Sequence, residues 1–214
     1  MNKKFFNASK TKILLAILVV ICSIVVIAPA TPEIQYKFRK KVKLQYAEED
    51  IFLEDDDERI KNLQTEHESG NLRERMLVIP TIGVYIDIVE GDSEEALSRG
   101  AWRRPNSSTP DKGGNTVITA HRFQYVPPNN KTFYNLDKLE KGEKILIYWQ
   151  KIEYIYQVDD IFIVTPIQLS IEENTEEDIL TLYTCHPLWT ANNRYVVRAS
   201  LIKTQEYLSS VENF

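Results

Sequence analysis

The chain is poor in cysteine and histidine and has no excess of positive charge. Its 214 residues include two cysteines and three histidines, and the formal net charge is −5 with a pI near 5.4. A nucleic-acid-binding protein needs a basic surface to neutralise phosphates, so we expect no nucleic-acid partner. Two cysteines exclude a disulfide framework, and the paired cysteine spacings typical of structural zinc sites are missing.

Long apolar runs are also rare, since only residues 13–30 form one (ILLAILVVICSIVVIAPA). A helix of this length covers most of a bilayer core of about 30 Å. Four of the first 12 residues are lysines, which predicts a cytoplasmic N-terminus and an extracytoplasmic remainder. We interpret 13–30 as a single-pass signal anchor in the cell membrane. A cleaved signal peptide is the alternative, because Ala28-Pro29-Ala30 fits an A-x-A site. Cys22 would lie in the membrane, out of reach of Cys185.

The next segment, residues 31–74, is rich in charge and poor in apolar pattern. We expect a solvated stalk, partly helical, that lifts a domain off the membrane. The apolar triplet Ile51-Phe52-Leu53 offers an alternative, in which the segment folds back over an active site as a lid. His67 is expected to be exposed. Residues 205–214 are expected to form a polar tail without a second membrane span.

From residue 75 onward the sequence contains apolar runs of strand length bounded by Gly, Pro, Asn and Asp. A short helix is expected within 93–102, beginning after Ser93. Strands are expected at 76–80, 84–90, 115–121, 144–150, 152–159, 161–165, 179–185 and 194–202. Many short strands with tight connections and little helix predict an all-β domain over 75–204, built as a closed or nearly closed barrel.

Three residues at the ends of these strands suggest a catalytic site. Cys185 ends one predicted strand just before Pro187, and His121 ends another. Arg194 opens the last strand nine positions after the cysteine, and a hairpin would bring the two together. An imidazole can take the proton of a thiol nucleophile and return it to a leaving amine, while a guanidinium can stabilise an oxyanion. A lone cysteine can also be a small buried hydrophobe, and a metal site from Cys185, His186 and His121 is a further alternative.

Four segments resemble those of sortases: TLYTC (181–185), GGNTVITAHR (113–122), RYVVRA (194–199) and RMLVIPTIGVYIDIVEG (75–91). The order His, Cys, Arg agrees as well, and the resemblance covers roughly residues 75–203. It implies an eight-stranded barrel with Cys185 as nucleophile, His121 as acid/base partner and Arg194 at the oxyanion. Arg194 fits the family arginine better than Arg198, because it lies at the junction of loop and strand.

The resemblance further implies a transpeptidase that cleaves an LPxTG-like C-terminal sorting signal on secreted proteins. The acyl group would pass from Cys185 to an amine of a cell-wall peptide precursor or of a pilin. Thr184 and Ala120 are expected to touch the substrate backbone, and Trp189 either lines the groove or packs beneath it. The alternatives are a cysteine hydrolase of the same fold and a catalytically silent barrel that serves as a binding module.

No cofactor is expected, although some sortases bind calcium through acids before the cysteine strand. The acids in that region here are Glu172, Glu173, Glu176, Glu177 and Asp178. The chain departs from the pilus-building pattern, because it has no C-terminal membrane helix and its stalk lacks an Asp-Pro-aromatic lid motif. This favours a housekeeping or specialised anchoring role.

Overall fold

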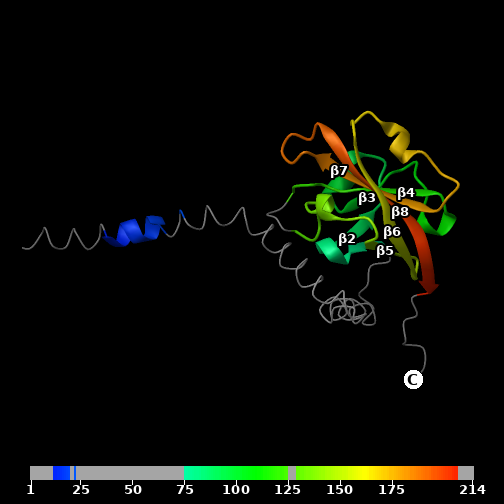
Figure 1. Ribbon diagram of the computed structural model, residues 1–214, viewed down its shortest axis with the longest axis horizontal. Coiled ribbons are helices and arrows are strands. Elements are labelled where there is room, and N and C mark those ends of the chain that lie inside the picture. The colour runs from blue at the N-terminus through cyan, green and yellow to red at the C-terminus, as the bar shows by residue number, and fades with distance from the viewer. Residues whose placement is uncertain (1–11, 20–21, 23–74, 125–128, 207–214) are drawn as a thin grey trace, which may run out of the picture. The chain divides into compact units, whose positions relative to one another are not determined.

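The computed structural model describes residues 12–19, 22, 75–124 and 129–206 (Figure 1). Residues 12–19 and 22 are helical and belong to a unit, Met1–Asp50, that is separate from the unit Ile51–Phe214. Within the described ranges, no helix combines the length and apolarity needed to cross a membrane. Much of the predicted anchor, the whole stalk 31–74 with its apolar triplet and His67, and the tail from residue 207 lie outside the described residues.

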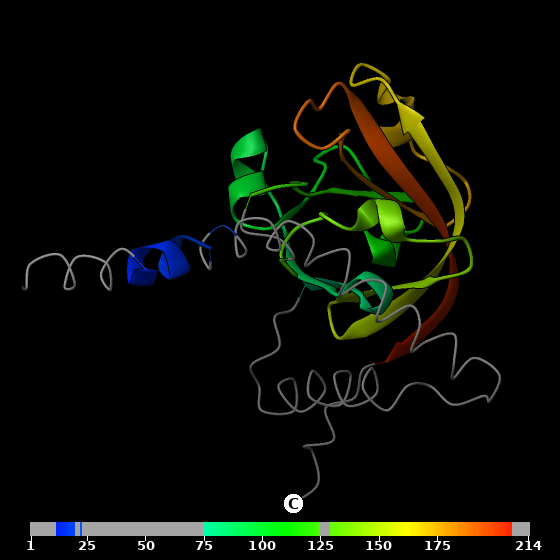
Figure 2. The same ribbon diagram turned by 60° about the vertical axis from the view of Figure 1, so that its left-hand side comes forward.

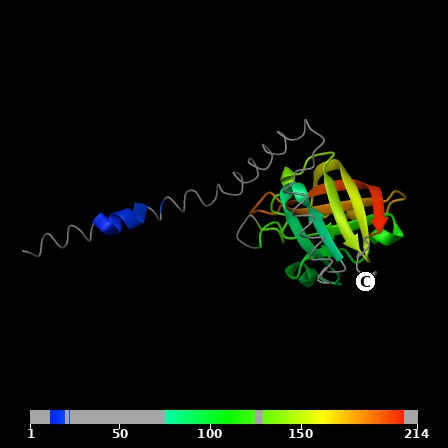
Figure 3. The same cartoon turned by 90° about the horizontal axis from the view of Figure 1, so that it is seen from below.

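The described residues from 75 onward form a closed barrel of eight strands (Figures 1 and 3). Around the barrel the order is β1-β2-β3-β4-β7-β8-β6-β5, with parallel pairing at β2–β3 and β4–β7 and antiparallel pairing elsewhere. The strands are β1 Arg75–Ile79, β2 Val84–Val89, β3 Ala101–Arg103, β4 Asn115–Thr119, β5 Lys144–Trp149, β6 Ile152–Val164, β7 Ile179–His186 and β8 Asn193–Glu206. The predicted all-β barrel is confirmed, as is the number of eight strands that the resemblance implied.

Short 3-10 helices connect the strands. They are η3 Pro80–Ile82, η4 Glu94–Ser98, η5 Pro110–Lys112, η6 Leu136–Lys138 and η7 Leu169–Glu172. The helix expected within 93–102 ends at Ser98, and the residues after it form the short strand β3, which the sequence pattern did not predict. Ser93 occupies the N-cap position of η4 without a side-chain cap hydrogen bond.

β6 corrects a second expectation, because the segments 152–159 and 161–165 are one strand rather than two. The acids Asp159 and Asp160 suggested a turn. Instead, the pairing of β6 with β8 shifts register between Val158 and Asp160, as at a β-bulge. A bulge bends a strand without ending it. Both carboxylates are exposed, and Asp160 accepts a hydrogen bond from Lys141 at 3.0 Å while Asp159 accepts one from Ser200.

The central strands β4 and β7 are buried on both faces. On one face Val117, Tyr183 and Val196 pack with Ile171 of η7 in a single hydrophobic cluster. Side chains alternate along a strand and directly paired residues share a face, so this surface of β4, β7 and β8 is here called the η7 face. Figures 1 and 2 show the η7 segment (yellow) and the loop after β7 (orange) above the barrel strands in both views.

The segment between β6 and β7 is tied to the start of β4 through Asn115, which is fully buried. Its Nδ2 donates to the carbonyls of Ile171 and Glu173 at 3.0 and 2.8 Å, and its Oδ1 accepts from Thr181 Oγ1 at 2.8 Å. Asn115 N in turn donates to Asn174 Oδ1 at 3.0 Å. One carboxamide therefore satisfies three buried polar groups and fixes η7 over its face of the barrel.

We expect Asn115→Ala to lower the free energy of unfolding by about 3 kcal/mol, because it strips the partners from two carbonyls and one hydroxyl. Urea denaturation followed by tryptophan fluorescence would measure the change. The control is Asn130→Ala, since Asn130 is exposed and accepts from Tyr85 only through its backbone carbonyl. A loss no larger for Asn115→Ala than for this control would show that the carboxamide does not anchor the segment.

Candidate active site

Cys185 lies directly across from Arg194 in the ladder between β7 and β8, and His186 lies across from Asn193. The hairpin expected from the spacing of nine is therefore present, closed by residues 187–192. Cys185 is a free, half-buried thiol. The register thus brings a thiol and a guanidinium to neighbouring positions at the end of the two strands.

His121 reaches the same level through the parallel pairing of β4 with β7. Thr119 is the partner of Tyr183 in this ladder, and His121 and Cys185 each follow two residues later. One residue further along both segments, Thr184 Oγ1 donates a hydrogen bond to the carbonyl of Ala120 at 2.8 Å. Phe133 N donates to the His121 carbonyl at 2.9 Å and fixes the backbone there. The histidine is half-buried and lies two residues after the end of β4.

Alternation assigns Cys185 and Arg194 to one face. Tyr183 and Val196 project from the η7 face, and Cys185 and Arg194 each lie two positions from one of them, so their side chains share that face. Val117 and Thr119 lie on the same face of β4, which ends at Thr119, two residues before His121. The strands therefore carry the thiol and the guanidinium to one end of one surface, and His121 follows β4 at the same end of the barrel.

The Arg194 guanidinium donates hydrogen bonds to the neighbouring loop through one of its nitrogens. Its Nη1 donates to the carbonyls of Ala191 and Asn193, both at 3.1 Å. Ala191 and Trp189 have positive φ values of 55° and 79°, which makes the loop turn tightly. With the described residues, Nη2 and Nε form no hydrogen bond, so they are free to donate to an oxyanion.

His186 lies next to Cys185 in sequence but on the opposite face. It contacts the Arg122 guanidinium, with 3.2 Å between Nη1 and Nδ1, and its ring lies 5.6 Å from that of Tyr195. Burial and then Asp137 raise the pKa of the Tyr195 phenol. His186 is thus engaged on the face opposite the thiol, which leaves His121 as the other histidine among the described residues.

The predicted metal alternative used Cys185, His186 and His121. Across the ranges that the structure describes, no three His, Cys, Asp or Glu side chains come together as metal ligands do.

Two of the acids considered for calcium are already paired. Glu172 lies 3.0 Å from Arg104 Nε and accepts from the Tyr183 hydroxyl at 2.7 Å. Burial, and then this carboxylate, raise the pKa of Tyr183, so the phenol stays protonated and donates. Asp178 accepts from the backbone N–H of Gly114 at 2.9 Å. These contacts hold η7 and the segment after it against the barrel.

The predicted substrate-binding residues occupy two different settings. Ala120 and Thr184 are buried, and Thr184 Oγ1 donates to the Ala120 carbonyl. Trp189 is 74% exposed and packs against Phe123 with 4.4 Å between ring centroids. It therefore stands on the rim of the site and does not pack beneath it.

Arg198, the alternative to Arg194, lies four residues further along β8 (198 − 194), across from Thr181. Its guanidinium lies over the Phe162 ring, 5.5 Å from the centroid. Among the described residues it forms no ion pair of the kind a surface arginine would be expected to make. Arg194 is the arginine at the level of the cysteine.

Sequence reasoning gave no role to Arg122, Asp137 or Phe123, although all three lie at this end of the barrel. Arg122 Nη2 lies 2.6 Å from Asp137 Oδ2 in an ion pair whose arginine is buried and whose carboxylate is partly exposed. A charged residue directly after a strand usually faces solvent, so no local signal marks Arg122 as buried. Its partner is 15 positions further along the chain (137 − 122), on η6.

Comparison with known proteins identifies the family of the barrel. Residues 77–202 match the Sortase domain family. Sortase D of Bacillus subtilis (strain 168) is 30% identical over 128 residues, 57% of this chain and 60% of that protein, and Sortase A of Bacillus anthracis is 28% identical over 127 residues, 59% of each. The chain therefore spans about 60% of the length of these curated relatives. Among solved structures, Sortase C of Streptococcus pneumoniae superposes with a TM-score of 0.55 at 34% identity, covering 62% of this chain and 68% of that one. Because the family match covers more than half of its length, this chain belongs to the sortase family.

Proposed function

We propose that the chain is a cysteine transpeptidase that cleaves an LPxTG-like C-terminal sorting signal and transfers the protein to an amine. The observation that carries the proposal is the pairing of Cys185 with Arg194 where β7 ends and β8 begins, with His121 two residues after the end of the neighbouring strand β4. Family membership supports the same reaction class. The acceptor is an amine of a cell-wall peptide precursor or of a pilin.

Each residue has one role in the reaction. Cys185 attacks the scissile carbonyl as a thiolate and forms a tetrahedral intermediate, whose oxyanion accepts hydrogen bonds from Arg194. His121 takes the thiol proton and gives it to the leaving amine as the C–N bond breaks, so a thioester remains on the sulfur. The acceptor amine then attacks the thioester and loses a proton to His121, and the new amide leaves with the thiolate restored.

The proposal includes the place of the reaction. Residues 13–30 carry no charge and follow a lysine-rich N-terminus, which supports a single-pass anchor with the barrel on the extracytoplasmic side. Substrate proteins would then meet the enzyme after export.

The reaction as proposed needs no cofactor. The pairing of Glu172 with Arg104 and Tyr183, and of Asp178 with Gly114 N, supports this, because these oxygens are already used.

The test is incubation of the whole chain, in detergent, with an LPxTG peptide, with and without an amine acceptor. We expect an amine-dependent product detected by mass spectrometry, formed equally in EDTA and in added calcium. Peptide release with no amine-linked product would favour the hydrolase, and no turnover of any sorting peptide would favour the silent binding module. Loss of turnover in EDTA that calcium restores would overturn the cofactor-free proposal.

A further inference from the structure

The Arg122 guanidinium contacts three segments on the face opposite the Cys185 side chain. Arg122 is only 7% exposed and lies 2.6 Å from Asp137 of η6. Its Nη1 lies 3.2 Å from Nδ1 of His186 and makes a long contact of 3.5 Å with the carbonyl of Cys185. The residue therefore links the end of β4, η6 and the end of β7, and it does so directly after His121.

The chemistry of this contact fixes the His186 ring. A guanidinium has only donors and stays protonated in proteins. His186 Nδ1 must therefore accept, which places the ring proton on Nε2. The ring cannot rotate or change tautomer without breaking its bond to Arg122, so the peptide that joins Cys185 to His186 is held at both of its ends.

The ion pair is a poor source of stability. Arg122 Nε and Asp137 Oδ1 are buried and have no hydrogen-bond partner among the described residues. Desolvation of a buried pair often cancels its attraction, and unpaired buried atoms add to the cost. The arrangement is thus better suited to fix the positions of the two strand ends than to stabilise the fold.

We propose that Arg122 is a positioning residue for the Cys185–His121 pair. Arg122 contacts the Cys185 carbonyl and the His186 ring from the face opposite the η7 face. These contacts keep the end of β7 aligned with His121. The inference rests on the proposed role of Cys185 as nucleophile. Displacing a reacting group by about 1 Å costs on the order of 100-fold in rate, so the guanidinium should affect kcat rather than substrate affinity.

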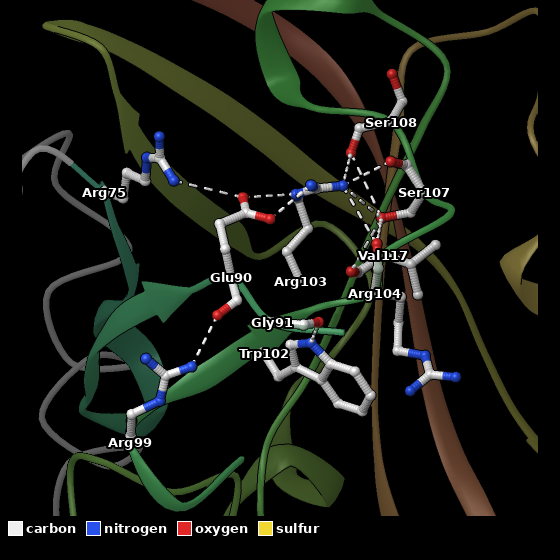
Figure 4. Close-up of polar contacts among 10 residues, drawn as sticks. All are labelled: Arg75, Glu90, Gly91, Arg99, Trp102, Arg103, Arg104, Ser107, Ser108 and Val117. Atoms are coloured by element: carbon white, nitrogen blue, oxygen red, sulfur yellow. Dashed lines mark hydrogen bonds and ion pairs between the residues drawn. The ribbon is translucent and has the colours of Figure 1, made fainter. Parts of the chain in front are cut away.

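The chain provides a matched control in the Arg103–Glu90 pair (Figure 4). Arg103 Nε and Nη2 donate to the two Glu90 oxygens at 2.8 and 2.6 Å, and Nη1 donates to the Ser107 carbonyl at 2.6 Å. Arg75 adds a longer ion pair of 3.6 Å to the same carboxylate. This arginine is likewise poorly exposed and bonded to a carboxylate and a carbonyl, but it contacts neither end of β7.

The experiment compares Arg122→Met, Arg122→Lys and Arg103→Met in the whole chain. Peptide transfer gives kcat and KM, thermal denaturation gives the melting temperature, and iodoacetamide gives the alkylation rate of Cys185 without a peptide. We expect Arg122→Met to lower kcat on the order of 100-fold with KM little changed, and to slow alkylation. Arg122→Lys, which keeps the charge without the fork, should recover part of the loss. Arg103→Met should lower the melting temperature while kcat and alkylation stay at wild-type values.

Three results would overturn the inference: wild-type kcat in Arg122→Met, an equal fall of kcat in Arg103→Met, or unchanged Cys185 alkylation in Arg122→Met. The alkylation rate separates this failure from failure of the proposed function. A wild-type thiol that is no more reactive than free cysteine refutes the nucleophile role and the inference with it. A reactive wild-type thiol that is unaffected by Arg122→Met refutes the inference alone.

Discussion

Cys185→Ala is expected to abolish peptide transfer, lowering kcat by at least about 10³-fold, because removal of a nucleophile eliminates the covalent route. The variant should also lose the acyl-enzyme, which mass spectrometry of the wild-type chain would detect as a thioester adduct on this residue. Cys185 is half-buried and its side chain lies on the η7 face. Its truncation should therefore leave the barrel with a cooperative thermal transition.

The matched control is Cys22→Ala, which removes the other thiol of the chain. Cys22 lies in the N-terminal apolar run, in a unit separate from the barrel, and its loss should leave both transfer and the adduct unchanged. Transfer that persists in Cys185→Ala and disappears in Cys22→Ala would remove the barrel cysteine from the mechanism.

The expected barrel followed from local pattern, because each of its longer strands is an apolar run bounded by turn residues. β7 and β4 are the clearest cases, since burial on both faces makes them nearly continuous in apolar and β-branched residues. β3 escaped prediction because a strand of three residues has no period to detect. β6 was divided in two because a pair of acids resembles a turn, and only its partner β8 reveals a bulge there.

The proximity of two site residues could be predicted where they lie on strands that are consecutive in the sequence and also pair with each other. Cys185 and Arg194 belong to one hairpin, so their separation along the chain already implies their proximity. His121 required the parallel pairing of β4 with β7, which no local pattern specifies, and its expected place came from resemblance. Arg122 could not be assigned a role, because its burial depends on Asp137 and His186, which approach only when η6 and β7 pack against it.

The position of Trp189 illustrates a different limit. A tryptophan in a loop is equally compatible with a buried and an exposed site, since its ring can cover apolar surface in either case. Its packing against Phe123 on the loop after His121 decides the question, and it is a contact between two segments 66 positions apart (189 − 123). Pairing of distant loops is set by the barrel's closure and cannot be read from either loop alone.

Arg194→Ala is expected to lower kcat on the order of 100- to 1000-fold while KM changes little, because the lost hydrogen bonds form with the oxyanion and not with the bound peptide. Steady-state transfer assays would separate the two constants. Nη1 also holds the Ala191 carbonyl, so a disturbed loop is a competing cause. Loop disturbance would raise KM and lower the melting temperature, whereas loss of oxyanion binding would do neither.

Arg198→Ala is the comparison that assigns the effect to one arginine. Arg198 shares strand and face with Arg194 but packs over Phe162 and lies across from Thr181, away from the level of the thiol. Its loss should reduce stability more than kcat. Arg194→Lys should restore only part of the rate, because an ammonium supplies charge without the planar fork that matches an oxyanion. Near-wild-type kcat in Arg194→Ala together with a large loss in Arg198→Ala would transfer the oxyanion role to Arg198, and the pairing of Cys185 with Arg194 would then be structural.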